Sequence, residues 1–208
     1  FGDDQTLWRM CQSMFPCGTP YETLQPDAMP ASIEAARKAL AEAGYANQKT
    51  VVINPTDFAA IHPQGVVTAD LLKRMGMNVE LQEIDWGTLV QRRASKEPPE
   101  KGGWSIFHTY GPSSAYINPA ASGIIRGQGL AGWFGWWDSP KAEQLVQDWL
   151  AAPDAARQKA LAQELARFAM NELPYINVGQ WFGKTAYRKS ITGVLQGAAP
   201  YPWNVRPA

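Results

Sequence analysis

The chain has 208 residues, of which 45% are hydrophobic and 18% charged, so it is long and apolar enough to bury the core of one large domain or two small ones. Basic and acidic residues both number 19, which gives a net charge of zero. Because nucleic-acid-binding domains usually carry a basic excess, the composition argues against that class of partner. No apolar run approaches the roughly 20 residues that span a bilayer.

The N-terminal part of the chain shows no sustained hydrophobic period. Residues 1–30 are rich in Pro, Gly, Cys and Met, and we expect them to form an irregular lead-in to a domain over residues 31–208. No signal-peptide pattern occurs, and the first residue is Phe1 rather than Met. We interpret this start as that of a processed protein or an excised fragment.

From residue 31 onward, helix and strand patterns alternate. Ser32 is a good N-cap and Gly44 a good helix terminus, so the first helix is expected between them. On the next helix, the apolar residues that indicate the buried side are Val67, Leu71, Leu72 and Met75. Apolar spacing and β-branched content predict the elements that follow at 50–54 (strand), 64–75 (helix), 77–86 (strand), 87–96 (helix) and 104–110 (strand).

This order predicts an α/β fold with a mostly parallel sheet flanked by helices, joined by right-handed crossovers. Residues 111–137 are predicted to be irregular. Two strongly amphipathic helices follow, the first capped by Ser139 with Pro140 at its first position, the second over about 154–172. One or two further strands are expected within 172–188.

Two cysteines, Cys11 and Cys17, lie close together in the lead-in. Their spacing does not match the paired thiols of structural zinc sites, so no metal site is expected. In an oxidising compartment the pair can close a small disulfide loop. The alternative is two free, buried thiols.

The sequence predicts no enzyme and no cofactor. Nucleophilic catalysis requires a nucleophile, a base and an orienting group, and the chain offers only two histidines as bases, His62 and His108. We expect His62 to be a solvated residue at a helix start, and His108 to lie at the end of a strand. No nucleophile elbow, zinc-protease or phosphate-loop motif occurs, and the glycine-rich stretch 127–132 lacks the following lysine of a phosphate loop.

Hydrogen-bonding and aromatic residues are concentrated in the irregular stretches. HTYGPSSAYINP, residues 108–119, follows a predicted strand end, where open α/β sheets bind their ligands. WFGWWD, residues 133–138, comes soon after. Aromatic walls with a few polar groups are typical of small-molecule sites, but rings that plug the edge of a sheet are the alternative. Trp137, beside the helix cap, is expected in the core.

Three segments in order resemble a known family. SIEAARKALAEAGY, TVVINPT and LLKRMGMNVELQEIDWGTLVQRR, followed later by NELPYINVGQ, resemble the C-terminal lobe of periplasmic dipeptide/oligopeptide-type substrate-binding proteins of ABC importers, extracellular solute-binding protein family 5. The resemblance covers roughly residues 30–195, and it rests on the order and spacing of the segments rather than on one motif.

The resemblance implies one lobe of a periplasmic binding protein type II-like fold. A small solute, peptide-like or other, would bind between this lobe and an N-terminal lobe that the chain lacks. The protein would be a periplasmic or lipid-anchored monomer that delivers its solute to ABC permease subunits and performs no chemistry. Such a location suits a Cys11–Cys17 disulfide. By position, the residues expected to bind the ligand are His108, Tyr110, Gly111, Ser113, Ser114 and Tyr116, with Trp133 and Trp136 as walls.

One feature departs from the family pattern. Peptide-binding members commonly have an aspartate just after the strand that matches 104–110, and it pairs with the ammonium group of the ligand. Residues 108–119 contain no acidic residue, and a buried ammonium group without a counter-charge is strongly disfavoured. Two other functions are therefore also considered: an aromatic-rich hydrolase or carbohydrate-binding module, and a purely structural or interaction domain.

Overall fold

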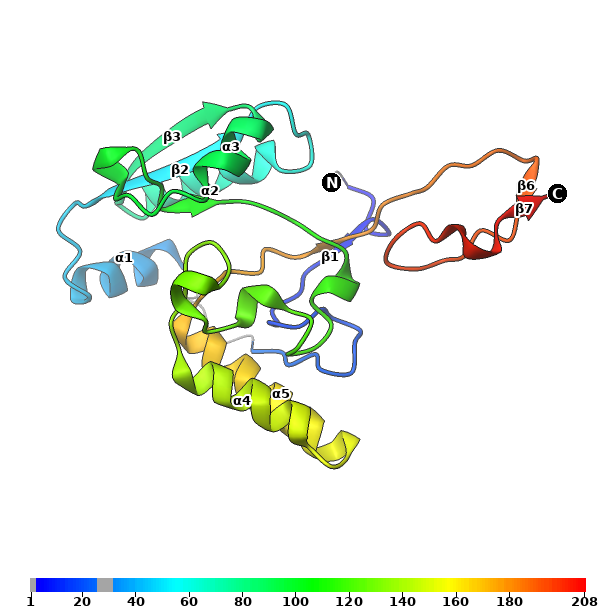
Figure 1. Ribbon diagram of the computed structural model, residues 1–208. Helices are drawn as coiled ribbons and strands as arrows, with labels where there is room; N and C mark the ends of the chain where they lie inside the picture. Colours follow the sequence, from blue (N-terminus) through cyan, green and yellow to red (C-terminus); the bar gives the residue numbers. More distant parts are fainter. Residues whose placement is uncertain (1–2, 26–31) are drawn as a thin grey trace. The chain divides into compact units, whose positions relative to one another are not determined.

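The computed structural model in Figure 1 describes residues 3–25 and 32–208. The chain divides into two compact units, one formed by Phe1–Ala28 with Gly111–Ala208 and the other by Met29–Tyr110. The division falls inside the predicted ligand-binding segment, between Tyr110 and Gly111. The predicted organisation is a lead-in over 1–30 followed by one lobe over 31–208. The division into two units does not test it, so it remains a prediction.

The unit of residues 29–110 is built on a three-stranded parallel sheet. Its strands are β2 (Lys49–Pro55), β3 (Asn78–Ile84) and β4 (Ile106–Phe107), in the order β3-β2-β4. Val52 of the central strand pairs with Leu81 on one side and with Ile106 on the other. Strand β2 is buried from Thr50 to Pro55, as a β-branched apolar run in the middle of a parallel sheet should be. The predicted parallel sheet is thus confirmed.

Three helices belong to the same unit: α1 (Ile33–Glu42), α2 (His62–Arg74) and α3 (Trp86–Arg92). The predicted cap of α1 is present, because the Ser32 side chain accepts a hydrogen bond from the backbone N–H of Ala35. Asp85 caps α3 in the same way, accepting from the backbone N–H of Thr88 at 2.9 Å.

Helices α2 and α3 pack against β2 through different residues. On the α3 side, Leu89 packs with Val51 and Ile53 in a fully buried cluster. On α2 the buried residues are the small Gly65 and Ala69, whereas Val67 and Leu71 remain 66% and 43% exposed. Of the four apolar residues expected on the buried side, Leu72 and Met75 are partly buried, but Val67 and Leu71 do not face the core, because α2 approaches the sheet through its small residues, which permit closer packing.

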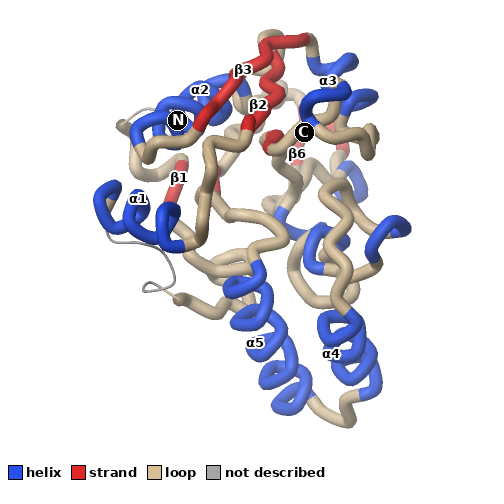
Figure 2. The backbone as a smooth tube through the Cα atoms, turned by 90° about the vertical axis from the view of Figure 1, so that its left-hand side faces the viewer, coloured by secondary structure: helices blue, strands red, loops and turns tan. Residues whose placement is uncertain are grey.

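The other unit contains the second hydrophobic core. Helices α4 (Pro140–Ala151) and α5 (Ala155–Glu172) lie side by side in both Figure 1 and Figure 2. The predicted cap of α4 is present, since the Ser139 side chain accepts a hydrogen bond from the third residue after it, and Asp154 caps α5 in the same way. The largest buried residues of this core are Met14, Phe15, Ile125, Leu145, Val146, Trp149, Leu161, Leu165 and Met170.

The aromatic residue beside the α4 cap belongs to this core, as predicted. Trp137 is half-buried and packs against the core cluster, with its ring 5.9 Å from that of Phe168 on α5.

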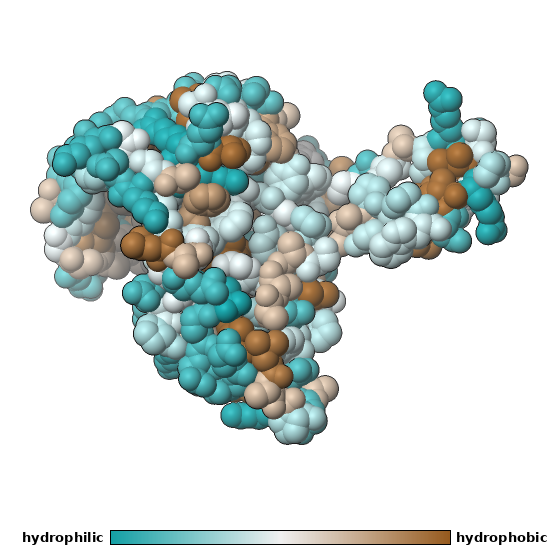
Figure 3. All heavy atoms as spheres, in the orientation of Figure 1, coloured by the Kyte–Doolittle hydropathy of each residue, from teal (hydrophilic) through white to brown (hydrophobic). Residues whose placement is uncertain are grey.

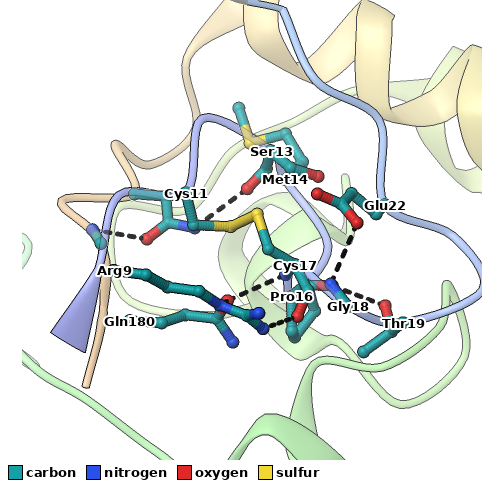
Figure 4. The surroundings of a disulfide bond; sticks show 12 residues. Arg9, Cys11, Ser13, Met14, Pro16, Cys17, Gly18, Thr19, Glu22 and Gln180 are labelled. Carbon is teal, nitrogen blue, oxygen red and sulfur yellow. Dashed lines mark hydrogen bonds between the residues drawn. A yellow bond between two sulfur atoms is a disulfide. The ribbon is translucent and has the colours of Figure 1, made fainter. Parts of the chain in front are cut away.

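The lead-in is fastened to the C-terminal part of the chain. Strand β1 (Trp8–Arg9) pairs antiparallel with β5 (Gln180–Trp181). The expected disulfide bond joins Cys11 and Cys17, whose Cα atoms are 5.8 Å apart. In Figure 4, the Gln180 side chain accepts hydrogen bonds from the backbone N–H of Cys17 and from the Arg9 guanidinium, which also donates to the Cys17 carbonyl.

The last part of the chain is extended. Strands β6 (Ile191–Thr192) and β7 (Arg206–Pro207) pair with each other, and no residue from Phe182 to Ala208 is buried. Apolar side chains are visible on the surface of this segment in Figure 3, and Leu195 and Val205 are among its exposed residues. Within the described ranges, the helices are too short or too polar for any of them to traverse a bilayer.

Candidate functional site

The carboxyl ends of the three parallel strands carry an aromatic cluster. Phe58 follows β2, Trp86 follows β3 and Tyr110 follows β4. The Phe58 ring meets Trp86 edge-on at 4.9 Å and Tyr110 edge-on at 5.6 Å between ring centroids. We call Phe58, Trp86 and Tyr110 the aromatic cluster. It lies at the edge of the sheet where open α/β folds bind their ligands.

Hydrogen bonds from two backbone N–H groups hold the segments that carry these rings. The N–H of Thr56 donates to the carbonyl of Ile84 at 2.9 Å, and the N–H of Trp86 donates to Oδ1 of Asp57 at 2.8 Å. The loops after β2 and β3 are therefore fixed to each other. Tyr110 is 43% exposed, so one ring of the cluster is available to a ligand.

The ionisable groups at this edge have both signs. The Arg93 guanidinium lies 5.9 Å from the Trp86 ring centroid, and partial burial lowers its pKa. Hydrogen bonds from the side chain and the backbone of Thr88 lower the pKa of Asp85. Asp57 is exposed and uses one carboxylate oxygen to bind the Trp86 N–H. The edge therefore offers aromatic faces, a carboxylate and a guanidinium.

His108 is buried, with 8% of its surface exposed. Its Nε2 lies 2.8 Å from the Thr68 hydroxyl of α2, and burial lowers its pKa. A neutral, buried imidazole bonded to a helix side chain is placed to support the strand end. Its predicted role as a ligand contact stays a prediction.

The remaining residues of the predicted ligand segment lie in the other unit. Ser113 and Ser114 begin a 3-10 turn, Ser113–Ala115, that follows Pro112. The ring and hydroxyl of Tyr116 pack so closely on Gly111 that a side-chain Cβ at residue 111 would overlap them. Burial raises the pKa of the Tyr116 phenol. Gly111 and Tyr116 are thus brought together, whereas Ser114 is exposed.

The predicted aromatic walls form a tight turn. The N–H of Trp136 donates to the carbonyl of Trp133 at 2.8 Å, and Gly135 and Trp136 adopt positive φ values of 104° and 51°. Trp133 is 37% exposed and its ring lies 5.2 Å from that of Phe134, edge-on. A non-glycine residue in the left-handed region is uncommon and marks this turn as a constrained element. Whether the rings line a ligand site stays a prediction.

Two site residues were missed by sequence reasoning. Phe58 and Trp86 contact Tyr110 or one another, and each follows the end of a parallel strand, which is the signal that identifies them.

His62 has an ion-pair partner in Glu83, at 2.8 Å. In the part of the chain that the structure describes, no three histidine, cysteine or acidic residues come together in a group that could hold a metal ion.

Comparison with known proteins places this geometry in context. No protein-family model matches the chain. Over 175 residues the chain is 34% identical to the probable peptide ABC transporter periplasmic-binding protein y4tO of Sinorhizobium fredii, a match that covers 84% of the chain and 33% of that protein. The chain therefore spans about a third of the curated relative.

Solved structures show the same fold. The dipeptide-binding protein of Pseudoalteromonas sp. SM9913, in complex with Met-Leu, superposes with a TM-score of 0.74 at 19% identity, over 97% of this chain and 40% of that one. The clavulanic acid biosynthesis oligopeptide binding protein 2 gives a TM-score of 0.75 at 18% identity, over 100% of this chain and 40% of that one. The Escherichia coli murein tripeptide-binding protein MppA gives 0.72 at 15% identity, over 96% and 40% of the two chains.

The sequence match and the fold agree with the resemblance found in the sequence, and the α/β fold predicted from it is confirmed. The chain is thus similar in sequence to part of a peptide ABC transporter periplasmic-binding protein, and its fold is that of part of the type II periplasmic binding proteins.

Proposed function

We propose that this chain is part of the extracytoplasmic solute-binding component of an ABC importer. It captures a small solute and delivers it to the permease subunits of the membrane, and it does no chemistry on the solute. The similarity to a peptide ABC transporter periplasmic-binding protein supports this role and a periplasmic or lipid-anchored location. The Cys11–Cys17 disulfide supports the same location, because such bonds persist in oxidising compartments.

The observation that carries the proposal is the aromatic cluster at the carboxyl ends of three parallel strands. Phe58, Trp86 and Tyr110 provide rings on which apolar or planar parts of a solute can pack. The solute would contact the exposed ring of Tyr110 first. A hydrolase or carbohydrate-binding module is the less favoured alternative, because the relatives are named as transport binding proteins.

We infer further that Asp57 can supply the negative charge that is missing from residues 108–119. It is next to Phe58 in the sequence, it is exposed, and Oδ1 accepts the Trp86 N–H at 2.8 Å. The second carboxylate oxygen has no hydrogen-bond partner among the described residues. A carboxylate beside aromatic rings is a favourable environment for an organic ammonium group, such as the amino terminus of a peptide.

The experiment is a ligand screen by thermal shift and calorimetry on the full-length protein, with di- and tripeptides, sugars and metal chelates as probes. We expect a peptide to raise the melting temperature, and Tyr110→Ala and Asp57→Asn to weaken its binding by about tenfold or more. Val67→Ala, which removes part of an exposed side chain of the same unit, serves as the matched control. If no solute stabilises the folded protein, the proposed function is wrong.

A further inference from the structure

Two buried polar side chains, those of Asn54 and His108, come from neighbouring strands near the carboxyl edge of the sheet. Ile53 of β2 and Phe107 of β4 are register partners, and both pack in the cluster on the α3 side. Because side chains alternate between the faces of a sheet, the next residues, Asn54 and His108, point to the opposite face. Their contacts with α2 agree with this placement.

Both side chains have polar atoms that lack a partner among the described residues. Asn54 is fully buried, and neither its amide oxygen nor its amide nitrogen is hydrogen-bonded. His108 bonds Thr68 through Nε2, but its Nδ1 is buried and unbonded. An unpaired buried polar group costs about 1–3 kcal/mol, so leaving two neighbouring ones unpaired would be expensive.

The close packing of α2 keeps Asn54 in this position. A Cβ atom at Gly65 would overlap the amide carbon and oxygen of Asn54. Gly65 itself is buried on α2, one turn before Thr68. The helix therefore closes over both polar side chains, and water from the bulk cannot pair with them.

We propose that the Asn54 amide is joined to His108 Nδ1 through one internal water, and that the hydrogen-bonded chain from Thr68 through His108 and this water to Asn54 positions the end of β4. An amide carries both a donor and an acceptor, so it can match either tautomer of a neutral imidazole. The chain of hydrogen bonds ties α2 to the two strand ends that lead to Phe58 and Tyr110. The positioning role rests on the proposed function, because Tyr110 is the ring offered to the solute.

The pairing is tested without any ligand. Nitrogen NMR of the full-length protein, with the His108 signals assigned by their loss in His108→Gln, reports the tautomer and the hydrogen bonding of Nδ1. In Asn54→Leu we expect the His108 signals to shift and the melting temperature to fall by about 3 °C or more, because Nδ1 is left unpaired. Thr50→Val is the matched control, since Thr50 is a buried polar residue of the same strand and face.

A stabilising effect of Asn54→Leu would show that the Asn54 amide has no hydrogen-bond partner. If Asn54 has no partner, replacing it by leucine removes a buried unpaired group, so the protein becomes more stable while the His108 signals stay unchanged, and the proposal is overturned. Should Asn54→Leu fail to fold, the wild-type spectrum decides: an Nδ1 signal typical of an unbonded nitrogen overturns it as well.

The positioning role is tested by solute affinity. We expect Asn54→Leu and Thr68→Val to weaken binding several-fold and Thr50→Val to leave it unchanged. Shifted His108 signals with unaltered affinity overturn the positioning role but keep the pairing. Absence of any bound solute contradicts the proposed function alone, because the NMR result needs no ligand.

Discussion

The histidine at the end of β4 shows how one buried residue makes stability depend on pH. Burial alone lowers the pKa of His108 from its ordinary value of 6.5, and no charged side chain among the described residues contributes to that shift. The ionisable residues of α2, the helix packed on it, have other roles: His62 pairs with Glu83, and Asp70 lies 3.8 Å from Arg74 at the surface. In the folded protein His108 is therefore neutral where the unfolded chain is already protonated.

The sign of the effect follows from that difference. Above pH 6.5, His108 is neutral in both the folded and the unfolded protein, and the free energy of unfolding has its full value. This free energy falls as the pH drops from 6.5 through the lower pKa that His108 has in the folded protein. We expect His108→Gln to reduce this loss between pH 6.5 and 5. Chemical denaturation as a function of pH measures it, with His62→Gln as the control, and identical pH profiles for wild type and His108→Gln would contradict the assignment.

A second prediction at the residue scale concerns the close approach of α2 to the sheet. Gly65→Ala places a methyl group where Asn54 lies, so either the amide or the helix must move. We expect a loss of about 1–3 kcal/mol in the free energy of unfolding. The matched control is Gly87→Ala on α3, where a Cβ would approach only Oδ1 of Asp85, at 3.1 Å. Equal effects of the two substitutions would show that the packing at Gly65 is not special.

At the scale of elements, a partly buried ion pair links the segment before α4 to the helix. Arg126 Nε lies 2.8 Å from Glu143 Oε1, which also accepts the N–H of Gly127 at 2.9 Å. The hydrogen bond from Arg126 lowers the pKa of Glu143. The stabilisation that the ionised Glu143 gives the folded protein is fully present above pH 4.5, the ordinary pKa of glutamate. It is lost as the pH falls through the lower pKa that Glu143 has in the folded protein.

Glu143→Gln tests this link. We expect it to weaken the attachment of residues 126–127 to α4 and to lower the melting temperature at neutral pH, with a smaller difference from wild type near pH 3. Glu164→Gln, on the exposed side of α5, is the control. A constant difference across this pH range would argue against an ionic contribution.

The disulfide loop is the second element-scale feature. The bond closes a loop with a sequence separation of 6, for which the chain-entropy estimate is about 2 kcal/mol. The loop is also bonded to the chain after α5, since the amide of Asn177 donates to the carbonyl of Ser13 at 2.9 Å. We expect the Cys11→Ser, Cys17→Ser double variant to unfold at a lower denaturant concentration than the oxidised protein. Equal midpoints would contradict a stabilising role.

At the scale of the whole molecule, patterns of neighbouring residues predicted the fold well. The β-branched run of β2 and the caps at Ser32 and Ser139 are local signals, and the structure has the elements they indicate. The exposed face of α2 was not predictable, because Gly65 and Ala69 pack on the sheet in place of larger residues. Burial on a helix depends on how closely it approaches its neighbour, which the hydrophobic period does not encode.

The candidate site could be predicted only in part for a related reason. Tyr110 was predicted because it follows a strand and lies in a polar stretch, whereas Phe58 is an isolated aromatic residue in an ordinary loop and Trp86 is the first residue of α3. They join Tyr110 only because three parallel strands end at one edge of the sheet. The pairing of Asn54 with His108 likewise depends on the register of β2 and β4, which no local pattern specifies.

The isolated chain offers a further prediction at this scale. It spans about a third of its curated relative, and binding proteins of this fold close around their ligands. We therefore expect the 208-residue chain alone to bind a solute much more weakly than the full-length protein, by about a hundredfold or more. Calorimetry with both proteins and the same solute measures the difference, and equal affinities would place the whole site within this chain.

The most direct test of solute binding at the aromatic cluster is a calorimetric titration of the full-length protein and its Tyr110→Ala variant with the solute identified by the screen. We predict saturable binding that is weakened by about tenfold or more in Tyr110→Ala and is unchanged in Val67→Ala. Wild-type affinity in Tyr110→Ala, or no binding by the intact protein, would contradict the account.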